Sequence, residues 1–208
     1  MSSKQGNFLQ WLTKMYGKAS KTSGFLELSS NIIELVLLQT NAQFHGIYSS
    51  QTSFIRPSSD LKKIHYYIFY LTENNDSKPK HFVTVITTPQ FVAYFDPLGS
   101  LPPPPPGSDQ PCSSGHAALR SFFEHRGKRT LYYHHRKTQS SASAVSTGFF
   151  CMFTILYIYA KTELYKDIES PIFYRERENL VKNDRICLEY LTCLIQDIPE
   201  FQKIEINT

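Results

Sequence analysis

The chain has no apolar stretch long enough to cross a bilayer. Its longest nearly unbroken apolar run covers residues 148–160, whereas a membrane-spanning helix needs about 20 apolar residues. The first residues also lack a charged start followed by an apolar core and a small-residue cleavage site, which is the pattern of a secretory signal. These absences predict a protein that has no membrane span, is not secreted and works inside a cell or a particle.

Cysteine is scarce, and its spacing excludes two common structural uses. Only 4 of the 208 residues are cysteine, and no two of them form a CxxC pair. A long chain without a secretory signal rarely depends on disulfides, and structural zinc sites usually need such closely spaced ligands. The sequence therefore predicts neither a disulfide framework nor a bound metal or cofactor. The four cysteines are Cys112, Cys151, Cys187 and Cys193.

The composition is sufficient for one folded domain with a short appendage. Hydrophobic residues make up 41% of the chain and aromatic residues 14%, which is enough to fill a core. Apolar side chains recur at helical spacing in Asn7–Lys18, and a polar segment ending at Gly24 follows. We expect an N-terminal amphipathic helix and linker over 1–24 and one domain over 25–208. The helix could dock on its own domain, on a partner or on a membrane surface.

Positive charge is concentrated in one stretch of the sequence. The net charge is +4, yet 161–208 hold seven Lys and Arg against ten Asp and Glu. The excess is densest between Arg120 and Lys137, where two tyrosines, Tyr132 and Tyr133, are interleaved. Such a stretch could bind phosphates and stack on bases, or it could be a solvated face beside a strand. The candidate nucleic-acid contacts are Arg126, Lys128, Arg129, Arg136 and Lys137.

The first half of the domain combines one helix with a hairpin-rich sheet. Ser30 is a good helix N-cap, and the spacing predicts a helix over 30–40. Alternating and β-branched patterns predict three strands that form an antiparallel meander, at 64–71, 81–86 and 91–95. Five prolines then follow at 102–106, which favour a stiff spacer or an SH3-type ligand.

The second half is predicted to be mainly helical. We expect a short helix over 117–125 and a strand over 129–134. Residues 148–161 are apolar on all sides, which indicates a buried central helix, and 176–196 are amphipathic. The predicted fold class is α+β, with a small mixed, largely antiparallel sheet, a buried central helix and flanking helices.

Four residues that could support acyl transfer occur at the ends of these elements. His81 begins a strand, and Asp96 ends the next one. A carboxylate beside an imidazole orients it as a base. Gln139, which follows a strand, could donate to an oxyanion. Thr147 stands where the buried helix begins, and the dipole at a helix N-terminus lowers the pKa of a nucleophile placed there.

This order of motifs resembles the adenain-like cysteine proteases, which include the adenovirus maturation protease, the Maverick/Polinton proteases and the SUMO-processing proteases. Their pattern is His-Trp, Phe-Asp/Glu-Pro-x-Gly, Gln, then Cys-Gly-x-Phe at the start of the central helix. The matching strings here are His81-Phe82, Phe95-Asp96-Pro97-Leu98-Gly99, Gln139 and Gly148-Phe149-Phe150-Cys151-Met152-Phe153. Phe44-His45-Gly46-Ile47-Tyr48 also resembles the Phe-Leu-Gly-Thr-Tyr string of adenain. The resemblance covers roughly residues 28 to 165.

The position of the family's nucleophilic cysteine is occupied by Thr147, and Phe82 replaces the tryptophan. A threonine hydroxyl ionises far less readily than a thiol, and its β-methyl group hinders attack. Ser146 is less hindered but is one residue out of register. Cys151 lies one helical turn further along, on the same face, and is expected to be a core residue rather than the fallback nucleophile.

The resemblance implies an endopeptidase that processes viral or mobile-element precursor proteins at Gly-containing sites. It further implies His81 as base, Asp96 as its partner and Gln139 as oxyanion donor, with DNA and a short peptide as activators and the virion and host nucleus as location. Two alternatives stay open. One is an inactive protease-fold protein that binds a precursor tail, a capsid partner or DNA; the other is a ubiquitin- or SUMO-type deconjugating protease.

Overall fold

The computed structural model describes ten segments of the chain, namely 30–39, 43–49, 55–60, 62–71, 81–104, 116–127, 129–134, 136–140, 147–161 and 180–187. The predicted N-terminal helix, its linker and the proposed domain boundary after residue 24 lie outside these residues.

A five-stranded sheet forms the centre of the described structure. Its strands are β1 (Phe44–Ser49), β2 (His65–Leu71), β3 (His81–Thr87), β4 (Phe91–Phe95) and β5 (Thr130–His134), and they lie side by side in chain order. Strands β2, β3 and β4 are antiparallel to one another, which confirms the predicted meander. Strands β1 and β5 each run parallel to their neighbour.

The sheet is therefore mixed, with two parallel and two antiparallel pairings, so it is less antiparallel than expected. Parallel neighbours need a crossover connection, and the connection from β4 to β5 contains a helix. Strand β1 was not predicted, because its alternation is broken at Gly46, where φ is +130°. Its pairing with β2 is irregular there, between Phe44 and Ile47.

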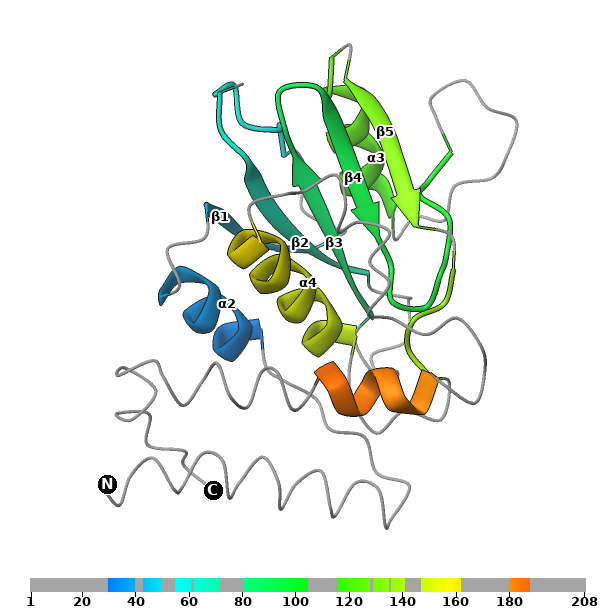
Figure 1. Ribbon diagram of the computed structural model, residues 1–208. Coiled ribbons are helices and arrows are strands. Elements are labelled where there is room, and N and C mark those ends of the chain that lie inside the picture. The colour runs from blue at the N-terminus through cyan, green and yellow to red at the C-terminus, as the bar shows by residue number, and fades with distance from the viewer. Residues whose placement is uncertain are drawn as a thin grey trace.

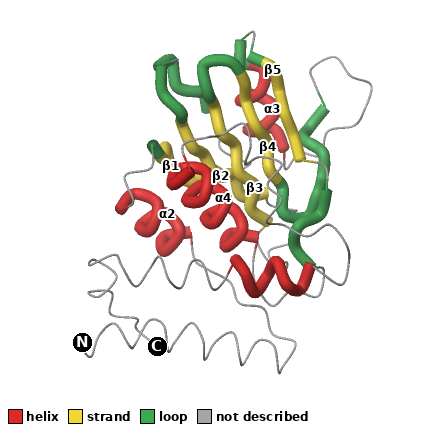
Figure 2. Tube along the Cα trace, in the orientation of Figure 1, coloured by secondary structure: helices red, strands yellow, loops and turns green. Residues whose placement is uncertain are grey.

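Helices cover both faces of the sheet (Figures 1 and 2). Helix α4 (Thr147–Lys161) packs on one face beside α2 (Ser30–Gln39), and α3 (Ala117–Glu124) packs on the other. The contact of α4 with β3 includes a hydrogen bond of 3.5 Å from Thr84 Oγ1 to the carbonyl of Cys151. The predicted helices at 30–40, 117–125 and 148–161 are thus confirmed within one residue at each end. The described part of the predicted helix 176–196 is helical over 180–187.

Side-chain alternation along the strands sorts the core into two layers. One buried cluster joins β2, β3 and β4 to α3 and includes Tyr67, Val83, Val85, Tyr94 and Phe122. The Tyr67 and Phe122 rings meet edge to face, with centroids 4.8 Å apart. Alternate residues of a strand point to the same face of the sheet. The residue two positions before Val83 and the residue two positions after Tyr94 therefore lie on the α3 side. Those residues are His81 and Asp96.

The proline run begins against the protein surface. Pro103 is buried, and Pro102 and Pro104 are half-buried. A polyproline segment that serves as an SH3-type ligand has to present its rings to the partner. The burial of these residues therefore favours the stiff spacer over the SH3-type ligand, and the spacer role stays a prediction.

Candidate functional site

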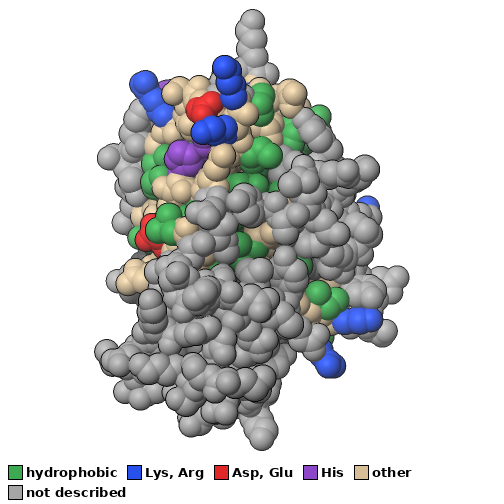
Figure 3. All heavy atoms as spheres, turned by 60° about the vertical axis from the view of Figure 1, so that its left-hand side comes forward, with side chains coloured by type: hydrophobic (Ala, Val, Ile, Leu, Met, Phe, Trp, Pro, Cys, Tyr) green, Lys and Arg blue, Asp and Glu red, His purple; other side chains and the backbone are tan. Residues whose placement is uncertain are grey.

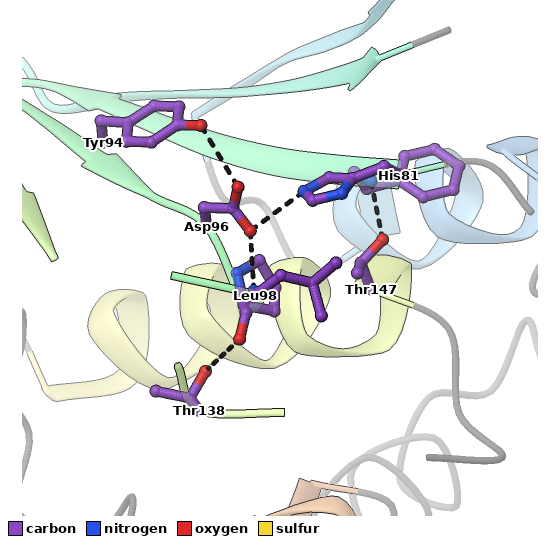
Figure 4. A network of polar contacts seen from close by, with 8 residues as sticks. His81, Tyr94, Asp96, Leu98, Thr138 and Thr147 are labelled. Carbon is purple, nitrogen blue, oxygen red and sulfur yellow. Dashed lines mark hydrogen bonds and ion pairs between the residues drawn. The ribbon is translucent and has the colours of Figure 1, made fainter. Parts of the chain in front are cut away.

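Two strand ends bring His81 and Asp96 together. The ladder between β3 and β4 ends with the pair Thr84 and Phe95, so both chains leave the ladder at the same end of the sheet. His81 Nε2 lies 3.0 Å from Asp96 Oδ1, and Figure 4 shows the imidazole directed at the carboxylate. A carboxylate oxygen only accepts, so Nε2 carries the hydrogen. The remaining ring nitrogen, Nδ1, is then the basic one.

Asp96 is held from several directions. Its side chain has no exposed surface, whereas 23% of the His81 side chain is exposed. The Leu98 backbone N–H donates to Asp96 Oδ1 at 2.7 Å, and the Tyr94 hydroxyl donates to Oδ2 at 3.4 Å. Burial, followed by the charge of Asp96, raises the pKa of Tyr94, so this phenol stays a donor. A buried carboxylate fixed in this way orients an imidazole that solvent can reach.

The turn after Asp96 also binds the backbone of the segment that contains Gln139. The Pro97 carbonyl accepts the backbone N–H of Thr138 at 2.9 Å and that of Gln139 at 3.0 Å. This approach requires a glycine at 99, because φ is +76° there and a Cβ would lie 2.6 Å from the Lys137 nitrogen. The Asp-Pro-x-Gly string therefore has two structural effects. It ends β4 next to Asp96, and its glycine allows the backbone that precedes Gln139 to approach closely. Gln139 itself is buried.

Thr147 lies at the start of α4, beside the residue that follows His81 (Figure 4). Its Oγ1 accepts the backbone N–H of Phe82 at 2.7 Å, and the residue is buried. The ladder between β3 and β4 ends before Phe82, so this hydroxyl satisfies an amide that β4 no longer reaches. Hydrogen bonds thus link the three predicted elements to this end of β3 and to the turn after Asp96. Asp96 contacts His81, Thr147 contacts Phe82, and the Gln139 backbone contacts Pro97.

Removal of the Thr147 hydroxyl should destabilise the fold. Thr147→Val keeps the branched shape but leaves the buried Phe82 N–H without this acceptor, which we expect to lower the free energy of unfolding by about 1–3 kcal/mol. Thr147→Ser retains the acceptor and is the matched control. Urea unfolding of the three chains measures the difference, and equal losses in the two variants would contradict a role for the hydroxyl.

The other nucleophile candidates differ in their surroundings. Cys151 is completely buried in α4, and burial raises the pKa of its thiol. Such a thiol is neither ionised nor within reach of a substrate, which supports the interpretation of Cys151 as a core residue. Ser146 lies outside the described residues.

Sequence reasoning missed a second histidine near the pair. His116 is half-buried at the start of α3, the helix on the side of the sheet that carries His81 and Asp96. Burial, and then the proximity of His81, lower the pKa of His116, while Asp96 acts in the opposite direction. His116 thus lies within electrostatic range of both members of the pair. Its position before a predicted helix was the available signal, but only the packing of α3 reveals the proximity.

The basic stretch is divided between the two ends of β5. Arg126 and Arg129 lie at the turn before the strand, where Arg126 donates to the carbonyls of Phe123 and Arg129, and Arg129 donates to that of Arg126. Arg136 and Lys137 follow the strand, and a five-residue strand spans about 16 Å. The run of charge in the sequence therefore does not form one compact cluster. Lys128 lies outside the described residues, and nucleic-acid binding stays a prediction.

Strands β1 and β2 bring together a separate pair of histidines. His45 Nε2 lies 2.7 Å from His65 Nδ1, and His65 Nε2 lies 2.8 Å from the Asp60 carbonyl. A carbonyl only accepts, so His65 carries a hydrogen on Nε2, and in the neutral ring its Nδ1 would accept from His45. His45 also stacks on Tyr67, with ring centroids 4.9 Å apart. On the face that Figure 3 presents, His side chains lie near Lys, Arg and acidic side chains.

The stability of the fold should decrease on acidification because of His45. Partial desolvation of the ring, and then the proximity of His65, lower the pKa of His45 from its usual 6.5, so the unfolded chain binds this proton more readily. The contribution is fully present above pH 6.5 and is lost as the pH falls through the lower pKa of the folded state. We expect His45→Phe, which keeps the stacking, to lose less stability than the natural chain between about pH 7.5 and pH 5. Urea unfolding across that range is the measurement, and identical pH dependence in both chains would exclude this origin.

Within the described segments, no three His, Cys, Asp or Glu side chains gather in a way that could hold a metal ion. Among the helices that the structure describes, none combines the length and apolarity that crossing a membrane requires.

No protein-family model matches this chain, and a search of curated proteins finds no match either.

Proposed function

We propose that this protein is an adenain-like endopeptidase that cleaves viral or mobile-element precursor proteins at Gly-containing sites. The observation that carries the proposal is the hydrogen-bonded pair of His81 and Asp96, with a buried carboxylate and a partly exposed imidazole. The order of motifs along the chain supports it independently. By the same resemblance, DNA and a short viral peptide are the proposed activators, and the virion and host nucleus the proposed location.

In the proposed reaction, His81 acts as general base through Nδ1. It takes the proton of the Thr147 hydroxyl while Oγ1 forms a bond to the carbonyl carbon of the scissile peptide. The imidazolium then gives this proton to the leaving nitrogen, and the C–N bond breaks to leave an ester on the threonine. Water, deprotonated by the same imidazole, then attacks the ester carbonyl. The bond from this carbon to Oγ1 breaks, and the imidazolium returns the proton to Oγ1 and so restores the hydroxyl. Asp96 stabilises the imidazolium in both steps.

The negative charge that develops on the carbonyl oxygen needs donors. The proposed donors are the side-chain amide of Gln139 and the backbone N–H groups at the start of α4, near Thr147. A helix N-terminus presents N–H groups without intrahelical partners and a favourable dipole, so it suits an oxyanion. This function assigns a role to the segments that carry Asp96, Gln139 and Thr147.

A second candidate function is supported by the environment of Thr147. Its oxygen accepts a 2.7 Å hydrogen bond from Phe82, which draws electron density away from a hydroxyl that is already a weak nucleophile. This bond favours an inactive protease-fold protein that binds a precursor segment and does not cleave it. The hydroxyl already has a structural role as the acceptor of the Phe82 N–H, and this role alone accounts for a threonine at position 147.

A cleavage and binding assay separates the two functions. Fluorogenic peptides with Gly-Gly-type viral cleavage sites are incubated with the natural chain, with and without DNA, and binding of the same peptides is followed by fluorescence anisotropy. An endopeptidase cleaves them, and His81→Gln abolishes cleavage while leaving binding intact. Binding without turnover in the natural chain supports the inactive protein. Absence of both binding and cleavage contradicts both functions.

A further inference from the structure

Helix 180–187 carries two polar residues in the middle of its buried face. Leu180, Asn183, Asp184 and Cys187 are all buried, and their spacing places them on one side of the helix. Asn183 has no exposed surface. A buried amide or carboxylate is unfavourable unless it is hydrogen-bonded, whereas an aliphatic side chain would bury well at either position. The polar residues therefore have specific partners on the surface that this helix covers.

Their partners are the peptide groups on either side of Gln139. Asn183 Nδ2 donates to the Thr138 carbonyl at 2.8 Å, a buried hydrogen bond between segments 45 positions apart in the chain. The Ser140 N–H donates to Asp184 Oδ1 over 3.4 Å, which is a longer and weaker contact. The helix thus contacts the backbone immediately before and immediately after the glutamine.

The same short segment is bonded on another side to the turn that follows Asp96. The Pro97 carbonyl accepts the N–H groups of Thr138 and Gln139, and it also accepts the Thr138 hydroxyl at 3.3 Å. The Gln139 backbone is therefore fixed between two elements. One is the turn that carries the carboxylate of the pair, and the other is helix 180–187. Loss of either set of bonds would free one side of the segment.

We infer that Asn183 is a positioning residue for Gln139, with Asp184 as a weaker second contact. Asn183 acts through the Thr138 carbonyl and does not touch the reacting atoms. The inference rests on the proposed function, in which the Gln139 amide donates to the oxyanion. The geometry of the site then depends on the docking of helix 180–187, which lies far along the chain. The apolar pattern of this helix alone would predict only that it packs against the domain.

The expected effect falls on turnover rather than on substrate binding. An oxyanion donor acts mainly in the transition state, so its displacement lowers kcat and leaves KM nearly unchanged. A shift of about 1 Å in a catalytic group costs up to about 100-fold in rate. We expect Asn183→Leu and Asn183→Ala to lower kcat by about 10- to 100-fold, with KM within about threefold of that of the natural chain.

The test combines kinetics with a direct observation of Gln139 in the full chain. Glutamine is labelled with ¹⁵N, the Gln139 signals are assigned with Gln139→Asn, and amide hydrogen exchange at Gln139 is measured by NMR. Asn183→Leu and Asn183→Ala should shift these signals and speed the exchange about tenfold or more. Val181→Ala changes an exposed residue of the same helix and should do neither. Asn183→Ala introduces no bulk, so it covers the case in which Asn183→Leu does not fold.

The two arms distinguish failure of this inference from failure of the proposed function. If the folded Asn183 variants keep the Gln139 signals and exchange rate of the natural chain, the inference is overturned, whether or not any chain cleaves peptides. If the natural chain cleaves and the variants change only KM, the inference is overturned as well. If no chain cleaves, the proposed endopeptidase fails, and the NMR arm alone decides whether Asn183 positions Gln139.

Discussion

Thr147→Cys is expected to raise the rate of peptide cleavage at least about 100-fold over that of the natural chain. Position 147 lies at the start of α4, next to the strand that carries His81. A thiol there would lie at a helix N-terminus, next to the backbone of the residue that follows His81. In the proposed mechanism it is also paired with the His81 imidazole, and both features lower the pKa of a cysteine. The natural hydroxyl gains far less from the same surroundings, because its pKa starts several units higher.

The substitution also removes two handicaps of the threonine. The β-methyl group that crowds the attacking atom is lost. Sulfur is a weak acceptor, so the hydrogen bond from the Phe82 N–H no longer competes strongly for the lone pairs of the nucleophile. The same loss should lower the free energy of unfolding by about 1 kcal/mol, because a buried amide is left with a poorer acceptor. We therefore expect a chain that is slightly less stable and much more active.

Two controls separate the causes of the increase. Thr147→Ser removes the methyl group but keeps a hydroxyl, so any gain it shows measures steric relief alone. Adding His81→Gln to Thr147→Cys should return cleavage to background, since the thiol loses its base. Initial rates with Gly-Gly-type peptides at equal enzyme concentration provide the comparison. If Thr147→Cys is no faster than Thr147→Ser, position 147 does not supply the nucleophile.

The central strands and the pair at their ends could be predicted because their signals are local. His81 and Asp96 each adjoin a strand whose β-branched and aromatic residues mark it clearly, and a tight connection over 88–90 makes those strands antiparallel neighbours. Residues at matched ends of two paired strands must lie close together. The buried helix at 147–161 was equally clear, because it is apolar on all sides.

The residues that sequence reasoning missed reach the site through nonlocal contacts. Strand β1 has too short and irregular a pattern around Gly46, and its parallel pairing leaves no turn signal. His116 approaches the pair only because α3 packs on the same side of the sheet. Asn183 lies 44 positions from Gln139 in the chain, and no local pattern indicates that a helix will contact that segment. Such contacts join segments that are far apart in the sequence, so no local pattern of residues predicts them.

Gly99→Ala should be among the most destabilising single substitutions in the described part of the chain. Its φ of +76° is unfavourable for any residue with a Cβ, and that Cβ would lie 2.6 Å from the Lys137 nitrogen and 2.9 Å from the Arg136 carbonyl carbon. Both neighbours are backbone atoms, so they cannot move aside as a flexible side chain would. Strain and overlap together should lower the free energy of unfolding by about 3–5 kcal/mol.

Gly127 offers a matched control for the conformational cost of a positive φ in a residue that carries a Cβ. Its φ is +67°, close to that of Gly99, but nothing lies within 4 Å of a Cβ built there. Gly127→Ala should therefore lose only the conformational part, about 1–2 kcal/mol. The difference between the two variants in urea unfolding measures the cost of close approach between the turn after Asp96 and the segment that precedes Gln139. Equal losses would mean that this approach can relax, and Gly99 would then no longer account for the contact between the turn and the Gln139 segment.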